Sequence, residues 1–103
     1  MKKIRALSFY IEDEIEDAEK YVKAAIEYKA KDKRLADLFF NLSNEEMKHM
    51  GLLHTEVVRI IEEYRATHGD PPEGMMAMYD ILHEKHVEDA KAVKILQGLY
   101  AES

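Results

Sequence analysis

Apolar residues recur at steps of three and four residues along most of the 103-residue chain. Steps of this size place side chains on one face of an α-helix, whereas a half-buried β-strand needs strict alternation of apolar and polar residues. No stretch of the chain alternates in this way. The pattern therefore predicts an all-α fold of amphipathic helices and leaves no segment for a sheet.

Two short polar breaks divide this pattern into three predicted helices. The first is expected over roughly residues 4–29, the second over 33–67, and the third from the break after residue 67 to about residue 100. The first break is so short that the first two helices should form an antiparallel hairpin. Because the second helix is longer than the first, the third helix is expected to cover its distal half, in the same chain or in a partner chain.

The residues at the breaks are types that begin and end helices. Asp32 is predicted to cap the second helix, and Gly69 to end it, since glycine is the usual residue just after a helix. Asp70 is predicted to cap the third helix, with Pro71 at its first position. Gly51 lies inside the second helix, where glycine costs about 1 kcal/mol relative to alanine. It should therefore mark either a close helix contact or a bend.

Composition limits the possible partners and locations. The chain is long enough for one domain, 1–103, with one modest core. Its 21 acidic and 15 basic residues give a net charge of −6, which argues against nucleic acid or an anionic membrane and favours cations. The absence of cysteine excludes disulfides and cysteine-ligated metal sites. No apolar run is long enough for a signal peptide or a membrane span, so a cytoplasmic location is expected.

A carboxylate and an imidazole interrupt the apolar face of the second helix. Glu46 and His49 are three residues apart, which is about one helical turn, so both side chains point the same way. An isolated buried charge costs several kcal/mol unless it is paired or bound to a metal. The pair therefore points to a bound cation. The residues at the same helical phase are apolar: Leu35, Phe39, Leu42, Leu53, Ile60 and Ile61.

Glu14 is the carboxylate that falls in the apolar phase of the first helix. If the hairpin turns near Ala30, Glu14 and Glu46 lie at the same distance from the turn and should meet at one level. Carboxylates and imidazoles in the interior of a helical bundle are suited to iron or manganese. A small change in register would instead bring one of four neighbouring acids to this level: Glu12, Asp13, Glu16 or Asp17.

Glu14, Tyr21 seven residues later, and the run LADLFFNLSNEEMKH that leads to His49 resemble the first half of a ferritin-like di-iron protein of the rubrerythrin type. The resemblance covers roughly residues 10–62 and is strongest to the encapsulated ferritins, which carry one such half in each chain. It implies that two copies related by a two-fold axis complete a four-helix bundle around two iron ions, with manganese as a possible substitute. The chain would then form a homodimer or a ring of dimers.

The same resemblance implies ferroxidase activity, in which Fe(II) is oxidised for iron handling or for protection against oxidative stress. Glu46 would bridge the two metals, and Glu14 and His49 would be terminal ligands, so these three are both the metal-binding and the catalytic candidates. Tyr21 is predicted to be a core residue.

Two features of the chain depart from the family. Full-length ferritins carry a second Glu and a second Glu-x-x-His, of which this chain has no clear copy. The final residues, QGLYAES, do not resemble an encapsulin-targeting tail, so the sequence does not support an encapsulin shell as a partner. The alternative function is a non-catalytic helical assembly protein, whose Glu/His cluster is vestigial or binds a structural ion.

The other histidines are not predicted to bind metal. His86 lies within the apolar stripe of the third helix and is expected to be a hydrogen-bonded core residue. Asp80 and His83 repeat the acid-x-x-His spacing beside that stripe, as chance allows in a chain this rich in acids. His54 and His68 are expected to be solvated.

Overall fold

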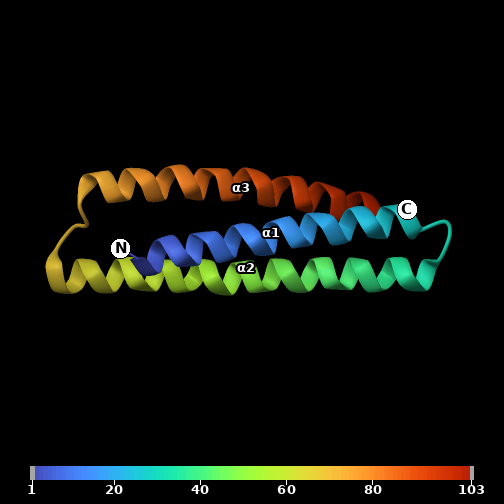
Figure 1. Ribbon diagram of the computed structural model, residues 1–103, viewed down its shortest axis with the longest axis horizontal. Helices are drawn as coiled ribbons and strands as arrows, with labels where there is room; N and C mark the ends of the chain where they lie inside the picture. The colour runs from blue at the N-terminus through green and yellow to red at the C-terminus, as the bar shows by residue number, and fades with distance from the viewer. Residues whose placement is uncertain (1, 103) are drawn as a thin grey trace.

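The computed structural model describes residues 2–102 and contains three α-helices, named α1 (Lys2–Tyr28), α2 (Lys33–His68) and α3 (Glu73–Glu102) (Figure 1). No strand occurs within these residues. The predicted all-α class is therefore confirmed, and both breaks fall where the polar residues of the sequence placed them. None of the three helices is both long enough and apolar enough to cross a membrane.

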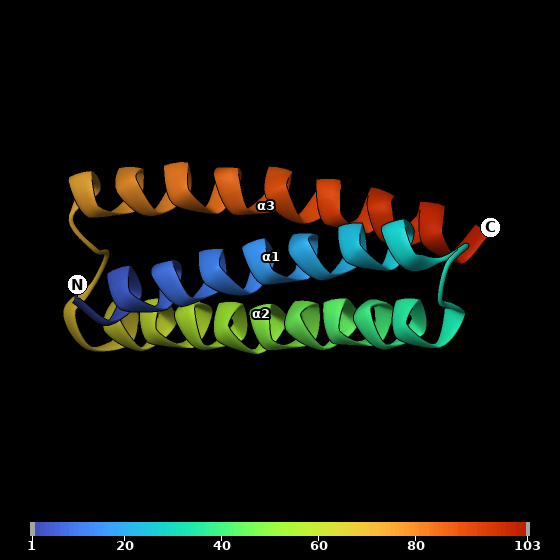
Figure 2. The same cartoon turned by 45° about the vertical axis from the view of Figure 1, so that its right-hand side comes forward.

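The helices form an elongated bundle that measures 55 × 19 × 18 Å. The helices α1 and α2 form the predicted antiparallel hairpin, and α3 runs alongside α1 in both ribbon views (Figures 1 and 2). Few positions of α2 come close to α3, whereas α1 contacts both of its neighbours. Within one chain, the prediction that α3 covers the distal half of α2 is therefore wrong, because α3 packs mainly on α1. Coverage of α2 by α3 of a partner chain stays a prediction.

The core is built around the buried face of α1. Small residues sit where α1 and α2 face each other: Ala18, Ala25 and Ala36 are completely buried and leave room for the two backbones to approach. Apolar side chains from all three helices fill the longer part of the core. These are Ile4, Ile11 and Ile15 of α1, Val57 and Ile61 of α2, and Val93 of α3.

Ser43 joins the three helices through its buried hydroxyl group. The hydroxyl donates a 2.7 Å hydrogen bond to the carbonyl of Ala18 in α1. The same oxygen accepts a 2.9 Å hydrogen bond from the side-chain amide of Gln97 in α3. A buried polar group costs free energy unless it is hydrogen-bonded, and here both partners are supplied by the neighbouring helices.

The predicted ends of α2 are confirmed, but the predicted role of its glycine is not. The Asp32 carboxylate accepts a 3.1 Å hydrogen bond from the Leu35 amide, as a helix cap should. Gly69 has a φ of 79° and donates its N–H to the carbonyl of Arg65. Gly51 has no atom of a neighbouring helix within 4 Å of the place where a Cβ would lie, so it does not mark a close helix contact.

The start of α3 differs from the prediction. The helix begins at Glu73, and Asp70 does not cap it but lies 3.8 Å from the guanidinium of Arg65. The carbonyl of Pro72 instead accepts the first hydrogen bonds of the helix. A residue that precedes a proline is disfavoured from helical geometry, so Pro71 cannot begin the helix while Pro72 follows it.

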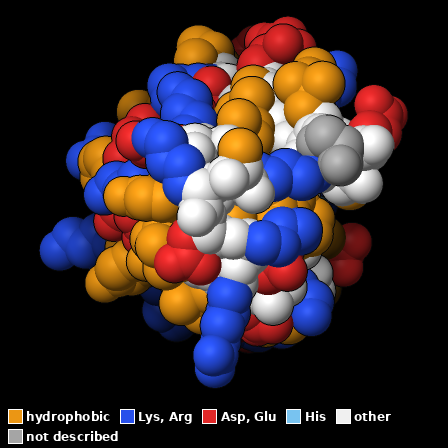
Figure 3. Space-filling view, turned by 90° about the vertical axis from the view of Figure 1, so that its right-hand side faces the viewer, with side chains coloured by type: hydrophobic (Ala, Val, Ile, Leu, Met, Phe, Trp, Pro, Cys, Tyr) orange, Lys and Arg blue, Asp and Glu red, His pale blue; other side chains and the backbone are white. Residues whose placement is uncertain are grey.

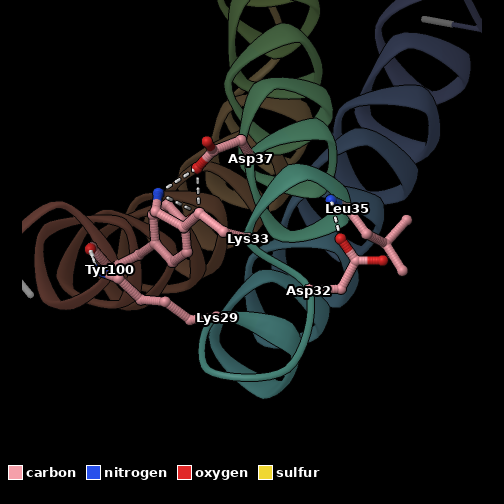
Figure 4. A network of polar contacts seen from close by, with 6 residues as sticks. All are labelled: Lys29, Asp32, Lys33, Leu35, Asp37 and Tyr100. Atoms are coloured by element: carbon pink, nitrogen blue, oxygen red, sulfur yellow. Dashed lines mark hydrogen bonds and ion pairs between the residues drawn. The ribbon is translucent and has the colours of Figure 1, made fainter.

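Tyr100 fastens the C-terminal half of α3 to the turn between α1 and α2 (Figure 4). Its ring stacks on Phe40 with centroids 4.6 Å apart, and its hydroxyl donates to the Asp37 carboxylate. The Lys29 ammonium donates to the Tyr100 carbonyl and lies over the Tyr100 ring, while Lys33 pairs with Asp37. Seen from this end, Lys and Arg side chains are interspersed with apolar ones (Figure 3).

Candidate metal centre

The hairpin brings the three predicted side chains together at its middle. Glu14 comes from α1, and Glu46 and His49 come from α2, one turn apart. Their potential ligand atoms all lie within 4.8 Å of one another, and they are the only group of three or more such residues within residues 2–102. The Nδ1 atom of His49 is 3.4 Å from Glu14 Oε2 and 3.8 Å from Glu46 Oε1. The two carboxylates therefore lie at one level of the hairpin, as counting from the turn predicted.

The cluster is half-buried and opens to solvent on one side. The side chains of Glu14 and Glu46 are 26% and 18% exposed, whereas that of His49 is 50% exposed. Along the same seam, Tyr21 stacks on Phe39 and Phe39 stacks on Tyr28. Tyr21 is thus a packing residue, as predicted, and the stack makes the seam apolar on the side of the cluster that faces the turn.

The two carboxyl groups are too close to be ionised together without cost. A hydrogen bond with Glu14, burial and the negative charge of Glu14 together raise the pKa of Glu46 to about 7. The charge of Asp17 raises this pKa further, while His49 lowers it. A hydrogen bond between two carboxyl groups requires a proton on one of them, so the metal-free cluster holds a proton near neutral pH.

One oxygen of the cluster lacks a partner. Glu14 Oε2 is buried and accepts no hydrogen bond, although the Nδ1 atom of His49 lies 3.4 Å away. A buried carboxylate oxygen without a donor is costly, and a cation at this position would satisfy it. Two carboxylates and one imidazole are also the donor set that first-row divalent metals such as iron and manganese accept.

The neighbouring acids that were alternatives to Glu14 as a metal ligand do not belong to the group of converging side chains. The Glu12 carboxylate is 3.0 Å from the Lys85 ammonium of α3, so it faces a different seam. Asp13 and Glu16 are exposed to solvent. Asp17 is half-buried and acts on the cluster through its charge, a contribution that the sequence reasoning missed although Asp17 follows Glu14 by one helical turn.

The remaining histidines agree with the predictions only in part. His68 is exposed and stacks on Tyr64, with ring centroids 4.8 Å apart. His54 was predicted to be solvated, but it is half-buried and its ring stacks on that of His83, 5.0 Å away. No sequence signal marked this pair, because it depends on how α3 is rotated against the hairpin.

His86 is a core residue, as predicted, but it is not fully hydrogen-bonded. It is 7% exposed, and its Nε2 atom has no partner.

We expect His86→Ala to lower the free energy of unfolding by about 1–3 kcal/mol, because it leaves a cavity. His86→Leu should restore most of this loss, since it refills the volume without an unpaired nitrogen. Urea unfolding measures both changes, and metal titration should give the parent stoichiometry for both variants. Loss of metal by a folded His86→Ala protein would instead identify His86 as a ligand.

The chain matches no protein-family model, and no curated protein and no solved structure matches it significantly. The resemblance to ferritin-like proteins therefore rests on the sequence pattern around Glu14, Glu46 and His49. The convergence of these three side chains is an independent observation, since it follows from the fold and not from any relative.

Proposed function

We propose that this protein is a ferritin-like iron protein, in which two copies of the chain share a two-metal centre that oxidises Fe(II). The observation that carries the proposal is the convergence of Glu14, Glu46 and His49, with one buried carboxylate oxygen that lacks a partner. An ordinary buried ion pair would not place two carboxyl groups so close that one retains a proton near pH 7.

The shared centre is proposed because one chain offers only part of a ligand set. Three side chains leave several positions of a metal ion open, and the open side of the cluster is the place for a second hairpin. Large apolar side chains near the same seam are also exposed. Tyr10 lies one turn before Glu14 and is 59% exposed, and Leu38 lies two turns before Glu46 and is 52% exposed. A second copy placed by a two-fold axis would cover both surfaces.

In the proposed reaction Fe(II) is the substrate. Two Fe(II) ions lose one electron each, and one dioxygen molecule takes two electrons and two protons and leaves as hydrogen peroxide. The protein supplies the carboxylate and imidazole ligands and an apolar seam beside them. By the ferritin-like resemblance, Glu46 spans both ions, while Glu14 and His49 each hold one. Binding of the ions displaces the proton from Glu46, so metal affinity should rise with pH.

The decisive test is oxidation of Fe(II) in air. The parent protein should develop near-ultraviolet absorbance faster than buffer, and Glu46→Ala should fall to the buffer rate because it removes the proposed bridging ligand. Glu16→Ala is the matched control, since it removes an exposed acid from α1 and should keep the parent rate. Tight metal binding without faster oxidation would favour the non-catalytic assembly protein with a structural ion.

Assembly provides a separate test of the shared centre. The metal-loaded protein should have a mass of at least two chains of 12.0 kDa each, because a single chain cannot complete the proposed ligand set. Light scattering coupled to gel filtration measures this mass directly. A metal-loaded monomer would contradict the shared centre even if iron were bound.

A further inference from the structure

The two halves of α3 are attached to the hairpin in different ways. In the C-terminal half, Gln97 and Tyr100 hydrogen-bond to α2 side chains. In the N-terminal half the ribbons of α3 and α1 diverge toward the left of Figure 2. A cavity of about 370 Å³ lies between these two helices there, and another of about 250 Å³ lies between α2 and α3. The second is lined by Val58, Ile61, Glu62, Arg65, Met76 and Tyr79.

Three imidazoles occupy the seams of this loosely packed half. The ring of His54 in α2 stacks on that of His83 in α3, with centroids 5.0 Å apart and planes 19° apart. Tyr79 stacks on the same His83 ring at 5.6 Å. His86, one turn further along α3, is buried with an unpaired Nε2 atom. Neutral rings stack well, but two imidazolium ions in this position would repel each other.

The surroundings favour the neutral forms of His54 and His86. Burial lowers the pKa of His54, and the neighbouring His83 lowers it further. Burial also lowers the pKa of His86, against the opposing effect of the Glu12 carboxylate. His54 has no carboxylate partner, so a proton placed on it would be both desolvated and close to a second imidazole.

The charged groups around these three histidines are mostly paired with each other. Toward His86, Glu12 of α1 and Asp89 of α3 both hold the Lys85 ammonium, at 3.0 and 2.8 Å. On the α2 side, the guanidinium of Arg65 is paired with Asp70. The remaining acids nearby are Glu62, which lines the cavity between α2 and α3, and the exposed Asp80 beside Tyr79.

We propose that His54, His83 and His86, together called the histidine cluster, form a proton-sensitive contact whose protonation below neutral pH releases the N-terminal half of α3 from the hairpin. The C-terminal half stays attached through Tyr100 and Gln97. Release would uncover apolar core residues of the hairpin, including Val57 and Ile61. This proposal does not depend on the metal centre, which uses none of these histidines.

The direction of the pH dependence follows from proton binding. The closed form takes up fewer protons than the open form, in which His54 and His86 regain the ordinary histidine pKa of 6.5. The closed form is therefore favoured above that pH and loses its advantage as the pH falls below it. An imidazole that is protonated only in the open form raises the open-to-closed ratio by up to about 30-fold at pH 5.

Pairs of spin labels can follow the two halves of α3 separately, because the chain has no cysteine of its own. The double variant Thr55→Cys/Glu84→Cys places labels on exposed positions of α2 and the N-terminal half of α3. Asn41→Cys/Lys94→Cys does the same for the C-terminal half. Both proteins are measured with chelator, diluted with unlabelled chain, at pH 7.5 and 5.0. The first pair should gain a longer distance at pH 5.0, and the second should not change.

Two variants in the Thr55→Cys/Glu84→Cys background identify the groups responsible. His54→Phe/His83→Phe/His86→Leu keeps two stacked rings and fills the His86 position with a side chain that takes up no proton, so it should stay closed at pH 5.0. If it fails to fold at pH 7.5, His54→Gln/His83→Gln/His86→Gln takes its place. His68→Phe removes an exposed imidazole elsewhere and should open like the parent. An unchanged first distance in the parent, opening of the stacked-ring variant, or lengthening of both distances would each overturn the proposal.

Discussion

Replacing Glu46 with alanine is expected to remove most metal binding while leaving the metal-free protein at least as stable as the parent. In the metal-free cluster, Glu14 and Glu46 are so close that the pKa of Glu46 is raised to about 7, which means that the native state disfavours its charge. Removing one carboxylate relieves this repulsion. The variant should therefore lose the stabilisation that a bound metal gives to the parent, and little else.

Thermal melts of the two proteins, each with chelator and with Fe(II) or Mn(II), measure this effect. The parent should melt higher with metal, and Glu46→Ala should not respond. His49→Ala should keep a weaker response, because by the proposed arrangement His49 holds only one of the two ions. Glu45→Ala is the control, since it removes an exposed acid next to Glu46 that pairs only with Lys48.

The opposite result is expected if Glu46 and His49 are simply a hydrogen-bonded pair. Removing Glu46 would then leave the imidazole without its partner and cost on the order of 1–3 kcal/mol in the metal-free protein. A large loss of stability of this kind, together with a parent that does not respond to metal, would end the two-metal proposal.

In the metal-free protein, the contribution of Glu46 to the free energy of unfolding is expected to fall as the pH rises through the region between 4.5 and 7. The ordinary pKa of a glutamate is 4.5, and in the native state that of Glu46 is raised to about 7. Native Glu46 therefore holds its proton more tightly than the unfolded chain does, and this advantage is lost when both forms are ionised. The contribution is on the order of 3 kcal/mol, since one pKa unit corresponds to about 1.4 kcal/mol.

Bound metal should reverse this trend, because metal ions and protons compete for the same carboxylates. Urea unfolding at a series of pH values, with chelator and with Mn(II), gives both curves. The proposed effect of the histidine cluster has the opposite pH dependence. The quantity to compare is therefore the difference in the free energy of unfolding between the parent and Glu46→Gln at each pH. A difference that does not depend on pH in the presence of chelator would show that the two carboxyl groups do not share a proton.

The helices and the convergence of Glu14, Glu46 and His49 were predictable because they depend on contacts that are local along the chain. Spacing of apolar residues gave the three helices, and Asp32 and Gly69 marked the ends of α2 by their own chemistry. A short turn limits the level of each residue in the hairpin, so counting from the turn favoured Glu14 beside Glu46 but left the neighbouring acids open. The predicted start of α3 was wrong because Pro72 disfavours helical geometry at Pro71, and this effect outweighs the capping ability of Asp70.

The position of α3 could not be predicted, because no short connection fixes its rotation. Its outer face is also apolar in places, since Ile81, Ile95 and Leu99 are 68%, 65% and 54% exposed. Periodicity therefore does not indicate clearly which face of α3 meets the hairpin. The stack of His54 on His83 follows from that rotation, and so it became visible only in the folded chain.

The buried hydroxyl of Ser43 has a consequence for how the metal centre can change during evolution. Ser43 lies one turn before Glu46, and its partner Ala18 lies one turn after Glu14, so their 2.7 Å hydrogen bond supports the alignment that the short turn gives to the two carboxylates. If α2 slid along α1 by one turn, the bond would break and the carboxylates would separate by about 5 Å. A substitution at position 43 can therefore weaken the alignment of the proposed centre while every ligand is still present, and descendants that keep all three ligands need not keep the same geometry.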